Sequence, residues 1–269
     1  MRNSGEPAVS DIDFATALRE AVALFAARDP ERRRFGARRH QYRFAAPISA
    51  ARLDEIERDA DVRFPDDYRE HVTTLGDGGA GPYFGLLPLD HPAQLARLRG
   101  AFDEHDPLRG SIGIAHLGCG YMALLVVDRD HPAYGQVWID LRGADDGVIP
   151  GYPSVRHCVT DWIQKLAHNE WLPQFVAPGA CALPHALSSF FHSIETKRGM
   201  APGSLAGDDL RAALAGIKHG GIATAATGDS SFFAAGDALD LCVACERLVE
   251  NLGMDHRVIT PGIAPIPSR

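Results

Sequence analysis

The spacing of apolar residues changes twice along this chain, and these changes limit the fold more than any single motif. Up to Leu75 the apolar residues recur at helical spacing. Between residues 82 and 153 they form short runs rich in β-branched and aromatic residues, bounded by Gly, Pro and Asp. Helical spacing then returns in residues 156–172. The sequence therefore predicts an α+β fold in which helices flank a sheet.

The sheet is expected to contain about five strands and to be largely antiparallel. The segment DRDHPAYG at residues 128–135 is a hairpin-type connection between two apolar runs. One helix, over residues 91–102, is expected among the strands. The expected strands are residues 82–89, 111–118, 121–128, 136–142 and 148–153.

Three amphipathic helices are expected before the sheet and one after it. The first covers residues 11–27, and the second opens at Pro47. The third begins at Pro65, where two acids follow the proline near the positive end of the helix dipole. Gly76 stands where a left-handed C-cap would end this helix. The closing helix covers residues 156–172.

The C-terminal part of the chain changes to Ala, Gly and small polar residues after a proline-rich stretch. Further helices are expected around residues 185–197, 208–218 and 231–252. We therefore predict three parts: an N-terminal helix with a basic linker (1–44), an α+β domain (45–175) and a helical C-terminal extension (176–269).

The formal net charge of −8 is concentrated in the middle of the chain. Residues 45–175 carry 11 Lys/Arg and 20 Asp/Glu, whereas residues 1–44 carry nine and six. An acidic surface repels nucleic acid and membrane phosphate, and it favours a basic protein partner. We therefore expect neither a nucleic-acid nor a membrane partner. The basic run ERRRFGARRH at residues 31–40 is interpreted as a solvated linker.

The sequence favours a cytoplasmic protein. No apolar run reaches the roughly 18 to 20 residues that span a bilayer. The N-terminal stretch MRNSGEPAVS lacks the basic and apolar regions of a signal peptide. The five cysteines are an odd number without the spacing of a disulfide scaffold, so we expect free thiols in a reducing compartment.

Cys242 and Cys245 form a C-x-x-C pair, which is the strongest metal or redox signal in the chain. A structural zinc site has four ligands. Folding would have to bring His219 and His256 to the two cysteines to complete such a site. A thioredoxin-type site would place the first cysteine at a helix N-terminus, whereas Cys242 is expected in the middle of a helix. We interpret both cysteines as small buried residues and predict no metal and no cofactor.

Residues 76–81, GDGGAG, have the G-x-G-x-x-G spacing of dinucleotide-binding loops. Such a loop needs a strand before it and a helix after it, so that the phosphate meets a helix N-terminus. Here the order is reversed, and Asp77 adds a negative charge where the phosphate would lie. The pattern is therefore interpreted as a helix-to-strand turn.

Several short motifs follow one another in a recognisable order. After the amphipathic helix ISAARLDEIERDAD come FPDDYREHV, DGG, FGLLPL, LGCGYMALLVV, GQVWIDLR and DWIQKLAHNEWL. Over about residues 46–172 this order resembles the SUKH superfamily. Two mild departures are Phe64 in place of the usual leucine before Pro65, and Asp77 in place of the common asparagine before the glycines.

The resemblance implies a binding protein and not an enzyme. Bacterial members of the superfamily are mostly immunity proteins of polymorphic and contact-dependent toxin systems, and fungal members include a cell-wall synthesis regulator. The implied function is to bind and neutralise a cognate toxin by occluding its active site, and the acidic middle segment predicts that this toxin is basic. The alternative is a regulatory or scaffolding module that uses the C-terminal helices for docking. A third hypothesis, a metal-dependent or thiol enzyme, depends on Cys242 and Cys245.

The candidate partner-binding residues are acids, with one aromatic residue, on the expected turns and helix starts. Such groups would attract and contact a basic partner if they are exposed. They are Asp77 and Tyr83 at the glycine-rich turn, Asp145 and Asp146 before the last strand, and Asp66 and Asp67 at the start of the third helix.

Overall fold

The computed structural model describes residues 13–142, 147–170, 172, 173, 175, 182–220 and 241–253. Its helices and strands follow the expected order, except that the short helix Ala37–His40 was not expected and residues 82–89 do not form a strand; η1 is a π-helical turn that continues α4. The elements are α1 (Phe14–Arg28), α2 (Ala37–His40), α3 (Ala50–Ala60), α4 (Asp66–Glu70), η1 (His71–Leu75), α5 (Pro92–Leu95), β1 (Ser111–Gly118), β2 (Tyr121–Val126), β3 (Val137–Asp140), β4 (Val148–Tyr152), α6 (Val155–His168), α7 (Ala182–Lys197), α8 (Gly207–Gly220) and α9 (Val243–Asn251).

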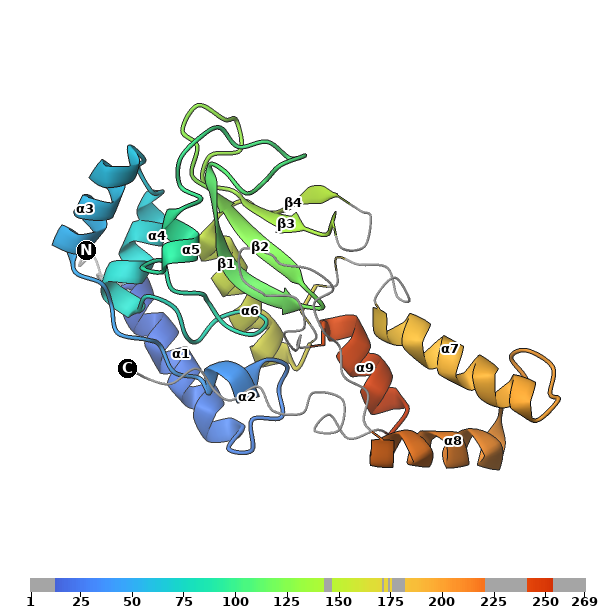
Figure 1. The fold of residues 1–269 in the computed structure, drawn as a ribbon. Coiled ribbons are helices and arrows are strands. Elements are labelled where there is room, and N and C mark those ends of the chain that lie inside the picture. Colours follow the sequence, from blue (N-terminus) through green and yellow to red (C-terminus); the bar gives the residue numbers. More distant parts are fainter. Residues whose placement is uncertain are drawn as a thin grey trace, which may run out of the picture.

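The four strands form one antiparallel sheet in the order β1-β2-β3-β4 (Figure 1). Each strand therefore pairs with its neighbour in the chain, as sequential hairpins do. Leu125 on β2 lies opposite Ile112 on β1 and Val137 on β3. The structure confirms the α+β class with an antiparallel sheet, but the sheet has four strands and not five.

The predicted strand at residues 82–89 is wrong. Leu86 makes only isolated bridges, to Gly79 and to Ala115 at the outer side of β1. Tyr83 and Gly85 have φ values of 53° and 96°, which turn the chain out of the extended conformation on both sides of Phe84. The segment is consequently a folded loop that lies along β1.

The helices differ from the prediction mainly at their ends. The second helix begins at Ala50, three residues after Pro47, because the Ser49 side chain caps it by accepting a hydrogen bond from Arg52 N at 3.1 Å. The helix expected over residues 91–102 covers only Pro92–Leu95. Gly76 has φ 166° and is extended, so the expected left-handed cap is wrong.

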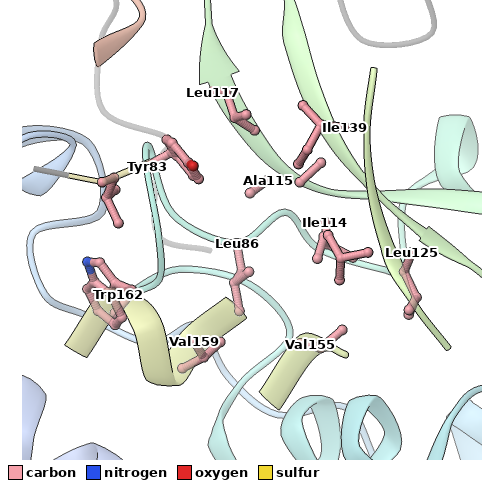
Figure 2. Packing of buried hydrophobic residues seen from close by; sticks show 14 of the residues in the cluster. Tyr83, Leu86, Ile114, Ala115, Leu117, Leu125, Ile139, Val155, Val159 and Trp162 are labelled. Atoms are coloured by element: carbon pink, nitrogen blue, oxygen red, sulfur yellow. The ribbon is translucent and has the colours of Figure 1, made fainter. Parts of the chain in front are cut away.

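The main core lies between the sheet and α6 (Figures 1 and 2). Val155, Val159 and Trp162 recur along one face of α6, and Figure 2 shows them in the same buried cluster as Ile114 and Leu125 of the sheet. All five side chains are at most 1% exposed. The amphipathic spacing of residues 156–172 thus supplies the helix that covers this face.

The N-terminal segment joins the same core. Leu18 and Val22 of α1 are buried in the cluster that contains Trp162. In the basic run at 31–40, Ala37 and His40 are buried, so the solvated-linker interpretation is wrong for these residues. Arg33 and Arg38 are exposed, which agrees with the solvated-linker interpretation at these two residues.

The C-terminal helices lie beyond one end of the sheet (Figure 1). Helices α7 and α8 confirm the first two predicted helices, and the turn between them is held by Glu195, which accepts hydrogen bonds from Gly203 N and Leu205 N. The predicted helix 231–252 is seen as α9 only, because residues 221–240 lie outside the described part of the chain. None of the helices within the described ranges has both the length and the apolar character to cross a membrane.

Candidate interaction surface

Asp77 is buried, in contrast to the exposed position expected for it. The residue is 8% exposed, and its carboxylate accepts hydrogen bonds from Leu89 N at 2.6 Å and Asp90 N at 3.2 Å. Burial raises the pKa of Asp77, while the two N–H donors act in the opposite direction. Asp77 thus fastens the glycine-rich turn to residues 89 and 90, and the expectation that a partner could grip it is wrong.

The backbone donors of the glycine-rich turn are also used within the chain. Gly79 N donates to Leu86 O at 2.9 Å, and Ala80 N donates to Arg43 O at 2.7 Å. A phosphate-binding loop keeps such N–H groups for its ligand. The turn instead joins the segment around Arg43 to the loop that carries Leu86.

Tyr83 is likewise inside the protein. It is 1% exposed, and its hydroxyl donates to Pro173 O at 3.0 Å. Burial is the main reason that the pKa of Tyr83 is raised above its usual value. The prediction that Tyr83 offers an exposed aromatic ring to a partner is therefore wrong.

Asp66 and Asp67 sit in the first turn of α4 but have different surroundings. The Asp66 side chain is 95% exposed, and its distance to the Arg63 guanidinium is 3.8 Å. The Asp67 carboxylate is half-buried and accepts a hydrogen bond from Arg156 N at 2.9 Å. Asp66 is thus available to a partner, whereas Asp67 ties α4 to the start of α6.

An open cleft of about 530 Å³ begins at these two acids. Its far side is formed by the connection between β2 and β3, whose Tyr134 hydroxyl donates to Arg63 O at 2.8 Å. Arg129 of the same connection also lines the cleft. The remaining candidates, Asp145 and Asp146, lie outside the described residues.

A stronger acidic surface lies on two loops that the sequence analysis did not select. Asp103, Glu104 and Asp106 are exposed in the loop before β1, and Asp130 is exposed in the connection between β2 and β3. We call residues 101–110 and 128–131 the acidic loop pair. It contains five acids, counting Asp128, and the two arginines Arg109 and Arg129.

The two loops are joined at their base. Phe102 N donates to the Asp128 carboxylate at 3.0 Å, and Val127 N donates to Gly110 O at 2.8 Å. The Phe102 ring packs edge-on against His131 and Trp138, with ring centroids 5.1 Å and 5.6 Å away. These contacts hold the acidic loop pair on the sheet, so its exposed carboxylates are presented from a packed base and not from a loose loop.

The signal for this surface was present in the sequence as the runs DEHD at residues 103–106 and DRD at 128–130. Each run alone is ordinary for a surface loop. The two runs form one acidic surface only because they are adjacent in space. The antiparallel pairing of β1 with β2 makes them adjacent, since it brings the start of β1 next to the end of β2. Arg129 connects the acidic loop pair to the cleft at Asp66.

The cysteine positions also differ from expectation. Cys242 and Cys245 are buried as predicted, but Cys242 is the N-cap residue of α9 and not a residue in mid-helix. A third cysteine, Cys119 in the turn between β1 and β2, lies beside them, with its Sγ 3.8 Å from that of Cys245. Cys158 is separate and buried in α6.

Comparison with protein families gives one match. Residues 47–158 match the SMI1 / KNR4 family (SUKH-1), which confirms the resemblance to the SUKH superfamily. The matched segment begins before α3 and ends inside α6, so it includes the sheet and the acidic loop pair. Comparisons with curated proteins and with solved structures returned no match.

Proposed function

We propose that this chain, whose residues 47–158 match the SUKH-1 family, is an immunity protein that binds a basic toxin and occludes its active site. The family match supports a protein-interaction or immunity module. The observation that carries the finer proposal is the acidic loop pair, which lies inside the matched segment. We place the encounter in the cytoplasm, where an immunity protein would meet an incoming toxin.

The charges of the acidic loop pair favour a basic partner. The described residues contain no ion pair to Asp103, Glu104 or Asp130, so these carboxylates are not neutralised by a close cation of the chain. Unpaired like charges on one surface attract a basic protein over about a Debye length, roughly 8 Å at physiological salt. Such charges raise the association rate more than they raise the final affinity.

The test is protection of cells that express a candidate toxin domain together with this chain, the candidates being secreted toxins whose genes are found next to this one. The wild-type chain is expected to restore growth. The variant Asp103→Asn, Glu104→Gln, Asp106→Asn, Asp130→Asn is expected to lose most of this protection, because it removes four charges without changing side-chain size. Restored growth by this variant, at equal protein levels, would count against the acidic loop pair as the binding surface.

A matched control removes the same number of charges elsewhere. Glu20, Asp59, Asp61 and Asp208 are also exposed, and they lie on α1, at the end of α3 and on α8. The corresponding Asn and Gln variant has the same net charge as the loop variant. It is expected to protect as well as the wild type, which would separate a local surface from a general effect of net charge.

The scaffolding alternative is supported by one observation in the C-terminal extension. Phe190 on α7 is 36% exposed, and its ring lies 5.8 Å from that of Phe191. An exposed aromatic side chain on a helix is a possible docking point for a partner. If Phe190→Ser in the full chain abolishes binding while the loop variant does not, the docking function of the extension replaces the immunity proposal.

A further inference from the structure

Three thiols meet where the C-terminal extension joins the sheet. Cys119 comes from the turn between β1 and β2, and Cys242 and Cys245 come from the first turn of α9. Their three sulfur atoms lie within 4.8 Å of one another. We call these residues the thiol cluster. Cys119 is more than 120 residues away from the other two in the chain, so tertiary folding brings it to them.

The spacing of the sulfur atoms suits a metal ion better than a disulfide. A disulfide needs an S–S distance of about 2.05 Å, whereas the Sγ atoms of Cys119 and Cys245 are 3.8 Å apart. In a tetrahedral zinc site with Zn–S bonds of about 2.3 Å, neighbouring sulfurs are separated by roughly 3.8 Å. The sulfurs of Cys119 and Cys245 therefore already have the separation of two ligands in such a site, and the Cys242 sulfur lies within 4.8 Å of both.

The backbone around Cys119 is specialised for this contact. Cys119 and Gly120 form a two-residue hairpin turn with φ values of 52° and 85°, a geometry for which the first residue is usually Asn, Asp or Gly. A cysteine in this left-handed conformation costs free energy, on the order of 1 kcal/mol. The chain thus carries a strained cysteine at the one turn that faces Cys242 and Cys245.

Gly118 provides the space for α9 to approach this turn. Its φ is 94°, and a Cβ atom there would lie 2.4 Å from both Leu241 C and Cys242 N. Because backbone atoms cannot give way as a flexible side chain can, any larger residue would push the start of α9 away. With glycine in place, Cys242 N reaches to 3.4 Å from the Cys119 sulfur.

We propose that Cys119, Cys242 and Cys245 bind a Zn²⁺ ion and thereby fasten the C-terminal extension to the sheet. The three thiolates fill three of the four positions of a tetrahedral site. Each thiol releases its proton to water as its Zn–S bond forms. The +2 charge of the zinc ion then offsets two of the three negative charges of the thiolates. The positive end of the α9 dipole at Cys242 also favours the thiolate form. Cys119 is only half-buried and gives the ion a way in.

The test is zinc binding by the full-length chain, reduced, freed of metal with a chelator and titrated with Zn²⁺ against a chromophoric competitor. The wild type is expected to hold one zinc per chain by elemental analysis. Each of Cys119→Ala, Cys242→Ala and Cys245→Ala should weaken binding by more than the roughly 10- to 100-fold that is lost with a supporting group around a metal site. Circular dichroism establishes that each variant is folded.

Cys158→Ala is the matched control, because it removes a thiol that is buried like those of Cys242 and Cys245 but lies on α6 outside the thiol cluster. It should bind zinc as the wild type does. Co²⁺ bound to the wild type provides a second readout that needs no variant, because thiolate ligation gives a charge-transfer absorption in the near ultraviolet. A folded, reduced wild type that binds no zinc, or a Cys158→Ala variant that loses zinc like the others, overturns the proposal. The proposal is also overturned if the protein forms a Cys119–Cys245 disulfide and its reduced form binds no metal.

Discussion

The two halves of this molecule are stabilised in different ways. The described residues between 13 and 175 have a main core between the sheet, α6 and α1, which includes Trp162, and a second, smaller cluster of Phe102, Val126 and Ala133. Among the described side chains of the C-terminal extension, α7 and α8 contribute Leu187 and Leu214 to the main core, whereas α9 and the two residues before it contribute several. We call the contact between the start of α9 and the sheet the junction. The described part of the extension is therefore joined to the main core mostly at this junction, whereas the SUKH-like part has buried side chains in most of its elements.

Acidification is expected to have the largest effect, and to act on the SUKH-like part. Burial lowers the pKa of His40 and of His71 to about 4 each, from an ordinary value of 6.5. Above pH 6.5 the two histidines are neutral in both states. Between pH 6.5 and 4 the unfolded chain takes up protons that the folded chain does not, so stability is lost as the pH falls, by about 2.7 kcal/mol per pH unit for two protons.

Urea denaturation between pH 7 and 4.5 measures this loss. In the His71→Gln variant the slope due to these two residues should be about half as steep, because one of the two protons no longer contributes. An unfolding free energy that stays constant over this range would show that the two buried histidines are not held neutral in the folded chain.

Replacing the central tryptophan is expected to have the next largest effect. Trp162→Ala should cost about 3 to 5 kcal/mol of unfolding free energy, because a fully buried ring leaves a cavity between α6 and the sheet. Leu214→Ala on α8 is the comparison, and it should cost clearly less because α8 has few buried neighbours. Equal losses in denaturant titrations of the two variants would remove the distinction between the halves.

The buried carboxylate of Glu57 gives a smaller effect within the SUKH-like part. It accepts a hydrogen bond from Phe64 N at 2.8 Å and pairs with Arg63 at 3.1 Å and with Arg69. Glu57→Ala should cost about 3 kcal/mol, since it leaves buried donors unpaired. Asp54 pairs with the same Arg69 but is 59% exposed, so Asp54→Ala should cost about 0 to 1 kcal/mol. Thermal unfolding of both variants measures the two losses. An Asp54→Ala loss as large as that of Glu57→Ala would contradict the difference expected between a buried and an exposed carboxylate.

The predicted loss of global stability at the junction is smaller than the losses predicted at Trp162 and Glu57. Gly118→Ala should cost about 1 to 3 kcal/mol and release the start of α9, because the new Cβ would collide with Leu241 and Cys242. Gly199→Ala is the matched control, since Gly199 also has a positive φ but has no atom within 4 Å of its would-be Cβ. Limited proteolysis should cut the extension faster in Gly118→Ala only. Equal cleavage of both variants would mean that backbone strain, and not the junction, controls the extension.

The sequence predicted the parts of the fold that rest on periodic patterns. The apolar spacing of residues 156–172 and the hairpin segment DRDHPAYG both correspond to what the structure contains. The segment 82–89 was predicted wrongly because its composition is typical of a strand, while the positive φ values at Tyr83 and Gly85 arise from packing against the neighbouring turn.

The surface was harder to predict than the fold. Asp77 reads as an exposed acid, because its role depends on N–H groups of Leu89 and Asp90 that only the folded chain brings to it. Cys119 carried no signal by itself, since its partners follow more than 120 residues later. Charge alone indicated an acidic middle segment, but the pairing of β1 with β2 decides that the acids of two loops form one surface.

We propose that the acidic loop pair of the SUKH-like part captures a basic toxin. The most direct test is the association rate constant of the purified chain with the toxin domain against which it protects cells, measured by stopped flow over a range of salt concentrations. The loop variant Asp103→Asn, Glu104→Gln, Asp106→Asn, Asp130→Asn should associate about tenfold or more slowly at low salt, with a weaker salt dependence, while the control variant keeps the wild-type rate. A loop variant that associates as fast as the wild type at every salt concentration would contradict the account.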